Sequence, residues 1–149
     1  MGGILNIAMT FDSLKWIGAE AEYDHNPLLI RFREIPQPFT RSKYPERLNV
    51  FWKMSEQDHN GLPSEDEFSR LEAFEDYLVG AVEHDEHSIL VAVLTCNGEK
   101  EFIFHTNDVP GFLSRLANIP HERERYPITI QRFHDSNWSY FESVIPKIC

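Results

Sequence analysis

The chain has 149 residues and a mass of 17.5 kDa, with 42% hydrophobic and 26% charged residues, which is typical of one globular domain. Fourteen basic residues against 24 acidic ones give a net charge of −10, which argues against binding to nucleic acid or to an anionic membrane surface. Two cysteines are too few for a disulfide framework, and no apolar run could span a bilayer, so we expect a cytoplasmic protein.

The first regular element predicted from the sequence is a β-hairpin. Apolar and polar residues alternate from Trp16 to Tyr23, and the alternation resumes from Leu28 to Arg33. The intervening Asp24-His25-Asn26-Pro27 is rich in turn-forming residues. Two alternating segments around such a turn predict two paired antiparallel strands.

Charge and apolar matching predict the register of this hairpin. If Tyr23 lies opposite Leu28, apolar residues pair across the strands and Glu20 lies opposite Arg31. In this register Arg31 and Arg33 find their acidic partners on the neighbouring strand of the hairpin.

A proline-containing loop from Ile35 to Glu46 and a strand from Arg47 to Met54 precede the first predicted helix. Ser64 and Glu67 have the spacing of a capping box, in which each side chain caps a backbone amide of the other residue. The helix is predicted to end near Glu83, with an apolar face formed by Phe68, Leu71, Phe74, Leu78 and Val82.

Ser88 to Cys96 is apolar on both faces, which predicts a central strand. Asn97-Gly98 is a strong hairpin signal and leads into a strand from Lys100 to Thr106. Asp108 is expected to cap a second helix that ends near Asn118.

The last predicted elements are a strand from Tyr126 to Phe133 and a short helix that Asp135 caps, that contains Trp138 and that Pro146 ends. After the hairpin, the order of elements is β-α-β-β-α-β. This order predicts an α+β fold with a ferredoxin-like antiparallel sheet and two helices on one face, to which the N-terminal hairpin and the short C-terminal helix are added. We expect residues 1–149 to form a single domain with a loosely ordered N-terminus at residues 1–13.

Several segments in order along the chain carry a family resemblance: Gly61–Glu65, Leu71–Leu78, Thr95–Gly98, Phe102–Phe104, Asp135–Tyr140 and Pro146. In these segments the chain resembles the bacterial family catalogued as domain of unknown function 695. Asp135-x-x-Trp138 is the most specific of the motifs. His105 stands where the family is expected to have an aromatic residue, usually tyrosine, and Ser136 where proline is expected. The resemblance supports the fold and implies no activity.

The acidic excess is concentrated between Ser55 and His87, which contain eleven acidic residues and one basic residue, Arg70. In helical projection four carboxylates form a narrow stripe beside the apolar face: Glu65, Glu72, Asp76 and Glu83. This stripe, here called the acidic stripe, is either a solvated helix face or a docking surface for a basic protein partner.

Glu75 differs from the acidic stripe because it falls inside the apolar arc of the helix. A carboxylate in that position needs a basic or amide partner, or its pKa will rise. Glu75 is therefore either a boundary residue that reaches solvent or a base, or a perturbed binding or catalytic carboxylate.

His105 is predicted to lie on the face of the sheet that the two helices leave uncovered, together with Phe51, Leu90 and Leu94. Three uses of this face are open: a cover formed by the segment around Trp138, a ligand site, or a dimer interface. If it is a ligand site, Glu75 or His134 could assist His105.

Glu83-His-Asp-Glu-His87 contains metal-binding residue types, but its position in a helix-to-strand turn favours an exposed loop. We predict neither a metal site nor a cofactor, and the sequence has no glycine-rich phosphate loop.

The leading hypothesis is a non-catalytic binding or regulatory domain that presents the acidic stripe to a basic protein partner. It predicts no nucleic-acid or membrane binding, and a monomer or homodimer. The alternative is a small-ligand binder or enzyme that uses the sheet face around His105.

Overall fold

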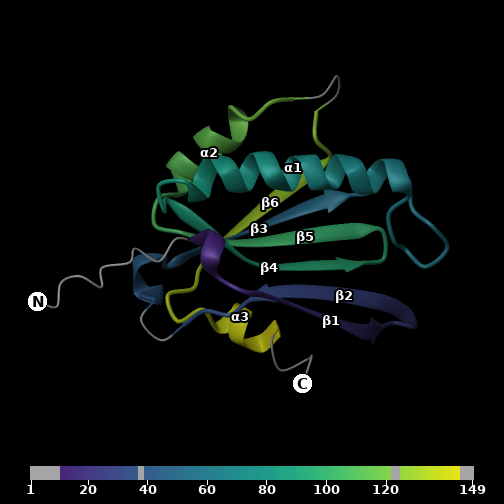
Figure 1. The fold of residues 1–149 in the computed structure, drawn as a ribbon, viewed down its shortest axis with the longest axis horizontal. Helices are drawn as coiled ribbons and strands as arrows, with labels where there is room; N and C mark the ends of the chain where they lie inside the picture. Colours follow the sequence, from purple (N-terminus) through teal and green to yellow (C-terminus); the bar gives the residue numbers. More distant parts are fainter. Residues whose placement is uncertain (1–10, 37–38, 122–124, 145–149) are drawn as a thin grey trace, which may run out of the picture.

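A six-stranded antiparallel sheet runs through the part of the chain that the computed structural model describes, residues 11–36, 39–121 and 125–144 (Figure 1). The strand order is β1-β2-β4-β5-β3-β6, so that β1 and β6 are the two edges. In chain order the elements are η2 (Phe11–Ser13), β1 (Trp16–Tyr23), β2 (Asn26–Arg33), η3 (Arg41–Lys43), β3 (Glu46–Lys53), α1 (Glu65–Glu83), β4 (Ser88–Cys96), β5 (Glu99–Thr106), α2 (Val109–Ala117), β6 (Ile128–His134) and α3 (Ser139–Val144).

The last four strands form the predicted ferredoxin-like order, β4-β5-β3-β6. α1 connects β3 to β4, which lie on either side of β5, and α2 connects β5 to β6, which lie on either side of β3. Both helices cover the same face of the sheet, where Leu71, Phe74 and Phe112 pack on Phe102 and Phe104 in one buried core. The predicted α+β fold is confirmed.

Only one of the two hydrogen bonds of the predicted capping box forms at the N-terminus of α1. The Ser64 hydroxyl accepts a hydrogen bond from the Glu67 amide at 3.2 Å. The Glu67 carboxylate does not return to Ser64. It is buried and accepts hydrogen bonds from the Trp52 indole at 2.7 Å and from the backbone and hydroxyl of Ser55. A buried carboxylate must be hydrogen-bonded, and these donors satisfy it better than the single amide of Ser64 would.

The predicted register of the first hairpin is wrong by two residues. Ala21, not Tyr23, lies opposite Leu28, and Gly18 lies opposite Arg31. Asp24 and His25 form a two-residue turn with positive φ angles of 53° and 67°, so Asn26 and Pro27 belong to β2 and not to the turn. A shift of two residues keeps each side chain on its predicted face.

A β-bulge in β4 overturns the expected orientation of Leu90. Leu90 pairs with Phe104, whereas Ala92 pairs with Ile103, so Val91 is an extra residue on one strand. Leu90 therefore lies in the core under the helices and not on the face of His105. Alternation alone does not reveal such an inserted residue.

The opposite face, here called the far face, carries a second buried core. Trp138, Phe141 and Val144 cover Ile89 and Ile103 there, and Phe11 completes the cover from the N-terminal side. Residues 1–10 lie outside the described part of the chain, but Phe11–Ser13 form a short helix with Phe11 buried, so the expected loose N-terminus is wrong for these three residues.

Trp138 precedes α3 and does not lie within it, contrary to the prediction. Its φ of 57° is incompatible with a right-handed helix, and α3 begins at Ser139. Asp135 still caps the helix, because its carboxylate accepts hydrogen bonds from the Ser139 and Tyr140 amides at 2.8 and 3.2 Å. The predicted stop at Pro146 lies outside the described residues.

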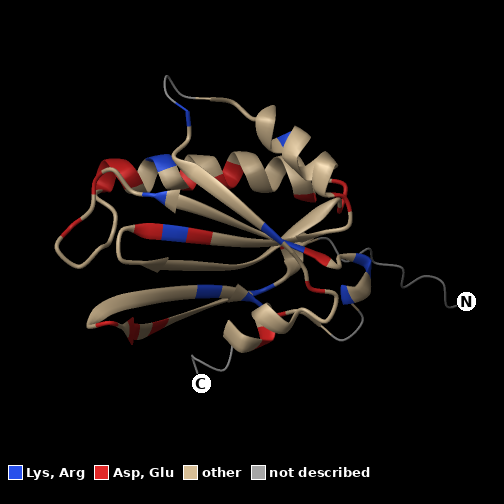
Figure 2. Ribbon diagram, turned by 180° about the vertical axis from the view of Figure 1, so that it is seen from behind, with Lys and Arg blue, Asp and Glu red and all other residues tan. Residues whose placement is uncertain are grey.

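Acidic residues gather along α1 and at the turns around it, whereas basic residues are spread over strands, helices and loops (Figure 2). Within the described residues no helix has the length and apolar character needed to cross a bilayer.

Candidate functional site

The acidic residues of α1 fall into two groups. Glu65, Glu72 and Asp76 are exposed, and none of their carboxylates has a hydrogen bond or ion pair to another described residue. Glu83 is 6% exposed, and its carboxylate accepts two hydrogen bonds from Arg33, at 2.8 and 3.1 Å. The expectation that Glu83 extends the exposed stripe is therefore wrong, because β2 runs under this end of α1.

Glu83 also accepts a hydrogen bond from the Leu90 amide at 2.8 Å. Burial raises the pKa of the Glu83 carboxyl, and the hydrogen bonds and charge of Arg33 oppose this increase. The residue serves as an internal anchor between α1, β2 and β4.

Glu75 of α1 also has a basic partner on β2, the strand that carries Arg33. The Arg31 guanidinium donates two hydrogen bonds to its carboxylate, at 2.6 and 3.0 Å. Arg31 and Arg33 thus both pair with α1, and not with the neighbouring hairpin strand as the sequence suggested. The true register explains the difference, because Glu20 lies opposite Leu29 and Arg31 lies opposite Gly18.

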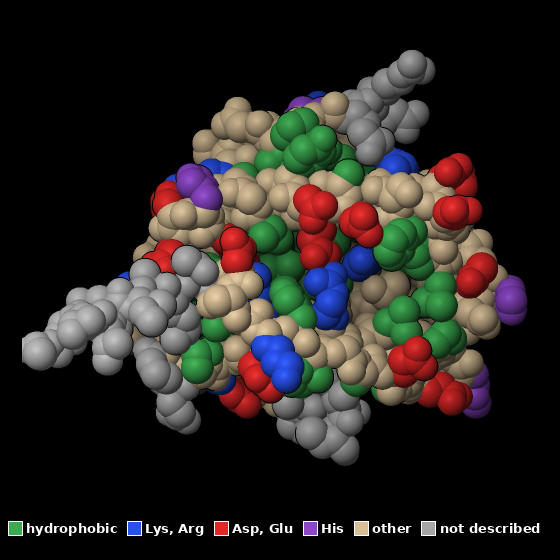
Figure 3. Space-filling model, viewed as in Figure 1, with side chains coloured by type: hydrophobic (Ala, Val, Ile, Leu, Met, Phe, Trp, Pro, Cys, Tyr) green, Lys and Arg blue, Asp and Glu red, His purple; other side chains and the backbone are tan. Residues whose placement is uncertain are grey.

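A groove lies between α1 and the β1–β2 hairpin, because the hairpin extends the sheet beyond the area that α1 covers. Figure 3 shows basic side chains recessed in this groove and acidic side chains along its rim. Its volume is about 610 Å³. We call it the hairpin groove. Its lining residues are Gly18, Ala19, Glu20, Leu29, Ile30, Arg31, Pro63, Phe68, Val93, Thr95 and Lys100.

Lys100 is the chemically distinctive residue of the hairpin groove. Its ammonium lies 6.0 Å from the centre of the Phe68 ring and 5.7 Å from that of Phe102. Burial lowers the pKa of Lys100, Glu75 and Glu72 raise it, and Arg31 lowers it further. The Lys100 ammonium has no hydrogen bond or ion pair to another described residue.

Phe68 also belongs to this groove. The sequence placed it on the buried face of α1, but the side chain is 50% exposed. It lies at the border of that face, where the helix no longer covers the sheet and the groove begins.

His105 is fully buried on the far face, as part of the cover that Trp138 forms. The two rings stack with centroids 4.2 Å apart, and His105 Nδ1 lies 2.9 Å from the Tyr44 carbonyl oxygen. Because a carbonyl can only accept, Nδ1 carries the proton and Nε2 is left buried without a partner. Burial lowers the pKa of His105 to about 4.

The residues of the alternative site are not brought together. His134 is exposed on β6, where it contacts Glu46, and Glu75 lies on the opposite side of the sheet from His105. His105 is sealed from solvent, so it cannot exchange a proton with a substrate in this conformation.

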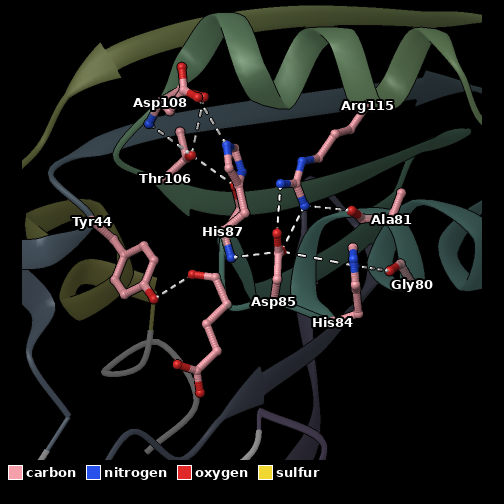
Figure 4. Close-up of polar contacts among 11 residues, drawn as sticks. Tyr44, Gly80, Ala81, His84, Asp85, His87, Thr106, Asp108 and Arg115 are labelled. Atoms are coloured by element: carbon pink, nitrogen blue, oxygen red, sulfur yellow. Dashed lines mark hydrogen bonds and ion pairs between the residues drawn. The ribbon is translucent and has the colours of Figure 1, made fainter.

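The Glu83–His87 segment forms internal contacts with neighbouring elements (Figure 4). Asp85 makes two hydrogen bonds with Arg115, at 2.7 and 2.8 Å, and these hydrogen bonds lower the pKa of Asp85. His84 Nδ1 lies 3.2 Å from the Gly80 carbonyl oxygen. Within the described ranges no cluster of three or more histidine, cysteine, aspartate or glutamate residues could hold a metal ion.

A chain of contacts around His87 resembles a catalytic triad. His87 Nε2 lies 3.2 Å from the Asp108 carboxylate (Figure 4). Its Nδ1 lies 2.7 Å from the Ser88 hydroxyl. However, Ser88 is fully buried and donates its proton to the Thr106 hydroxyl at 2.8 Å. A substrate could not reach this oxygen, so the chain holds β4, β5 and α2 together and is not a nucleophilic site.

A polar network on the far face explains the motifs that support the family resemblance. Arg47 donates to Asp135 at 2.7 Å, and its guanidinium lies between the rings of Phe133 and Tyr140, 4.3 and 4.4 Å from their centres. The Tyr140 hydroxyl lies 3.0 Å from Glu101, and burial together with Glu101 raises the pKa of Tyr140 to about 12. The motif residues thus fix α3 on the sheet.

These features define an α+β domain with a ferredoxin-like strand order, an added hairpin, and a groove between this hairpin and the first helix. The chain belongs to a family of unknown function, DUF695, whose model matches residues 15–144. Comparison with curated proteins gave no significant match, and neither did comparison with solved structures.

Proposed function

We propose that this protein is a non-catalytic binding domain that contacts a basic surface of a partner protein through the exposed carboxylates of α1. One observation supports the proposal most directly. Glu65, Glu72 and Asp76 are exposed and unpaired among the described residues, whereas Glu67, Glu75 and Glu83 on the same helix are paired inside the molecule.

The difference matters because the paired carboxylates already interact with donors inside the molecule. Of the residues compared, only the exposed carboxylates Glu65, Glu72 and Asp76 can form ion pairs with a partner. Exposed charges of one sign attract a partner of the opposite sign and raise its association rate, in a salt-dependent manner. The revised docking surface therefore comprises Glu65, Glu72 and Asp76, without Glu83.

A catalytic role has less support from the geometry. The two histidine arrangements that could transfer a proton, at His105 and at His87, both involve a fully buried group: His105 itself and the Ser88 hydroxyl. A small molecule could still bind elsewhere, and the hairpin groove is considered separately below.

The proposal is tested by pull-down from native cell lysate at low and high salt. The test variant carries lysine at Glu65, Glu72 and Asp76, and circular dichroism checks that it folds. The control variant carries lysine at Asp24, Glu34 and Glu99, three exposed acidic residues outside the acidic stripe. Both variants change the net charge equally.

A partner retained by the wild type and by the control, released at high salt and lost from the test variant supports the proposal. If the test variant and the control hold the same proteins equally well, the exposed carboxylates only solvate the helix and the proposal is wrong.

A further inference from the structure

An ion pair borders the hairpin groove. Arg31, a lining residue, bridges from β2 to Glu75 of α1 at 2.6 Å. Pro63, from the loop before α1, lines the groove as well. The volume of about 610 Å³ lies within the range of pockets that hold small molecules.

The pocket contains one cation that is not neutralised by contact. Arg31 is held by Glu75 through two hydrogen bonds. The Lys100 ammonium lies over two aromatic rings and is not within ion-pair distance of any described carboxylate. A half-buried ammonium without a counter-ion is a strong attraction for an anion.

A hydroxyl group accompanies this ammonium. Thr95 lies directly opposite Lys100 in the β4–β5 pairing, and both residues line the pocket. Thr95 is 7% exposed, and its hydroxyl makes no hydrogen bond to a described residue. The ammonium and the hydroxyl together can donate to the two oxygens of one carboxylate.

The other walls restrict the class of ligand. Leu29, Val93 and Phe68 line the pocket beside the two donors and suit an apolar group. Glu20 lines the pocket and Glu72 acts on Lys100 through its charge, and both negative charges disfavour a dianion such as a phosphate monoester more than a monoanion. A single carboxylate is the anion that fits both the donors and these charges.

We propose that the hairpin groove binds a small organic monocarboxylate, with its carboxylate between the Lys100 ammonium and the Thr95 hydroxyl and its apolar body against Leu29, Val93 and Phe68. The two donors and the apolar walls of this site are not residues of the acidic stripe, although Glu72 of the stripe acts on Lys100 through its charge. The proposal does not rest on the partner proposed above.

Hexanoate serves as the probe, and hexanamide, which has nearly the same shape without charge, as its control. Each is titrated into the ¹⁵N-labelled full chain and followed by NMR. We expect hexanoate to shift the backbone amides of Thr95, Lys100 and Gly18, and to bind about tenfold or more tightly than hexanamide. Equal affinity for the two compounds, or shifts elsewhere in the chain, would overturn the proposal.

Two variants separate the charge from the cavity. Lys100→Met keeps the length of the side chain and removes the ammonium, and we expect at least about tenfold weaker hexanoate binding. Gly18→Leu keeps Lys100 and fills the pocket, since a Cβ at Gly18 has no atom within 4 Å and the backbone there has no positive φ. Wild-type affinity in both variants contradicts the proposal, and the second variant remains informative if the first does not fold.

A further titration, with a peptide, tests whether the carboxylate is instead the C-terminus of a protein. A short apolar peptide is titrated with a free and with an amidated C-terminus. We expect neither peptide to bind as tightly as hexanoate, because a volume of about 610 Å³ suits a small molecule better than a peptide chain. Tighter binding of the free peptide than of hexanoate overturns the small-molecule assignment and makes the pocket a site for protein C-termini.

Discussion

The buried polar groups on the two faces of the sheet differ in their surroundings. On the far face, Trp138 stacks on His105 at 4.2 Å, and its indole and His105 Nδ1 both donate to the Tyr44 carbonyl, so the polar atoms are closed off by aromatic rings. On the helix face, Lys100 lies in a pocket that nothing described fills. The comparison teaches that burial alone does not identify a functional residue. A polar group closed in by its own chain stabilises the fold, whereas one that faces an open volume can accept a ligand.

The largest expected effect comes from opening the far face with Trp138→Ala. Removing a fully buried indole should lower the free energy of unfolding by about 3–5 kcal/mol, measured by urea denaturation. The exposed His105 should then titrate nearer its ordinary pKa of 6.5, as seen by NMR. Phe133→Ala is the control, since that ring is 43% exposed and its loss should cost about 1 kcal/mol. Similar losses for the two variants would show that the far face is not closed by Trp138.

The second prediction compares the two ion pairs on the helix face. Glu83→Ala leaves the buried Arg33 without a partner and should cost about 3 kcal/mol or more. Glu75→Ala leaves Arg31, whose side chain is 35% exposed and can be solvated, and should cost about 1 kcal/mol. Denaturation of both variants at one pH gives the comparison, and equal losses would contradict the buried position of Glu83.

The third prediction uses pH to test the closure of the far face. The pKa of His105 is about 4 in the folded chain and near 6.5 when unfolded, so below pH 6.5 the unfolded chain binds the proton first. Stability contributed by the neutral ring is present above pH 6.5 and is lost as the pH falls towards 4, by about 2 kcal/mol between pH 7 and pH 5.

In His105→Phe this part of the pH dependence should disappear, because phenylalanine does not titrate. Urea denaturation of both proteins at pH 7 and pH 5 measures it. The exposed histidines contribute equally to the two proteins and cancel. An unchanged slope with pH in the variant would show that another group carries the dependence.

The smallest effect is expected at the acidic stripe. Lysine at Glu65, Glu72 and Asp76 should change the free energy of unfolding by only about 0.5 kcal/mol in either direction, because these exposed side chains have no hydrogen bond or ion pair to a described residue. Thermal denaturation measures it. A loss of several kcal/mol would mean that the carboxylates are paired inside the molecule, and it would remove the contrast with Glu83 on which the proposed docking surface depends.

Local signals predicted the elements well. The Ser64 cap and the 3.6-residue periodicity located α1, Asn97-Gly98 located the β4–β5 turn, and Asp108 located α2. These features depend on residues close together in the chain, and backbone chemistry determines them directly.

Long-range relations could not be predicted in the same way. A helical projection placed Glu83 on the stripe because it contains no information on which strand lies beneath each turn of the helix. The bulge at Val91 changed the face of Leu90 without any sign in the alternation. Lys100 went unnoticed, although one signal was present: it shares a strand face with Phe102 and Phe104, where a lysine is unexpected.

The hairpin forms one end of the described sheet and pairs with it along one side, through Leu29–Phe32 of β2 and Ala92–Thr95 of β4. The two arginine bridges to α1, and Ile30 and Phe32 in the core of the far face, complete its attachment. An element attached along a single strand is expected to open before the ferredoxin-like core unfolds, which native-state hydrogen exchange can detect. Because one wall of the groove is this hairpin, the pocket exists only while the hairpin is docked. Any molecule bound there would therefore slow amide exchange in the first two strands and couple occupancy to local folding.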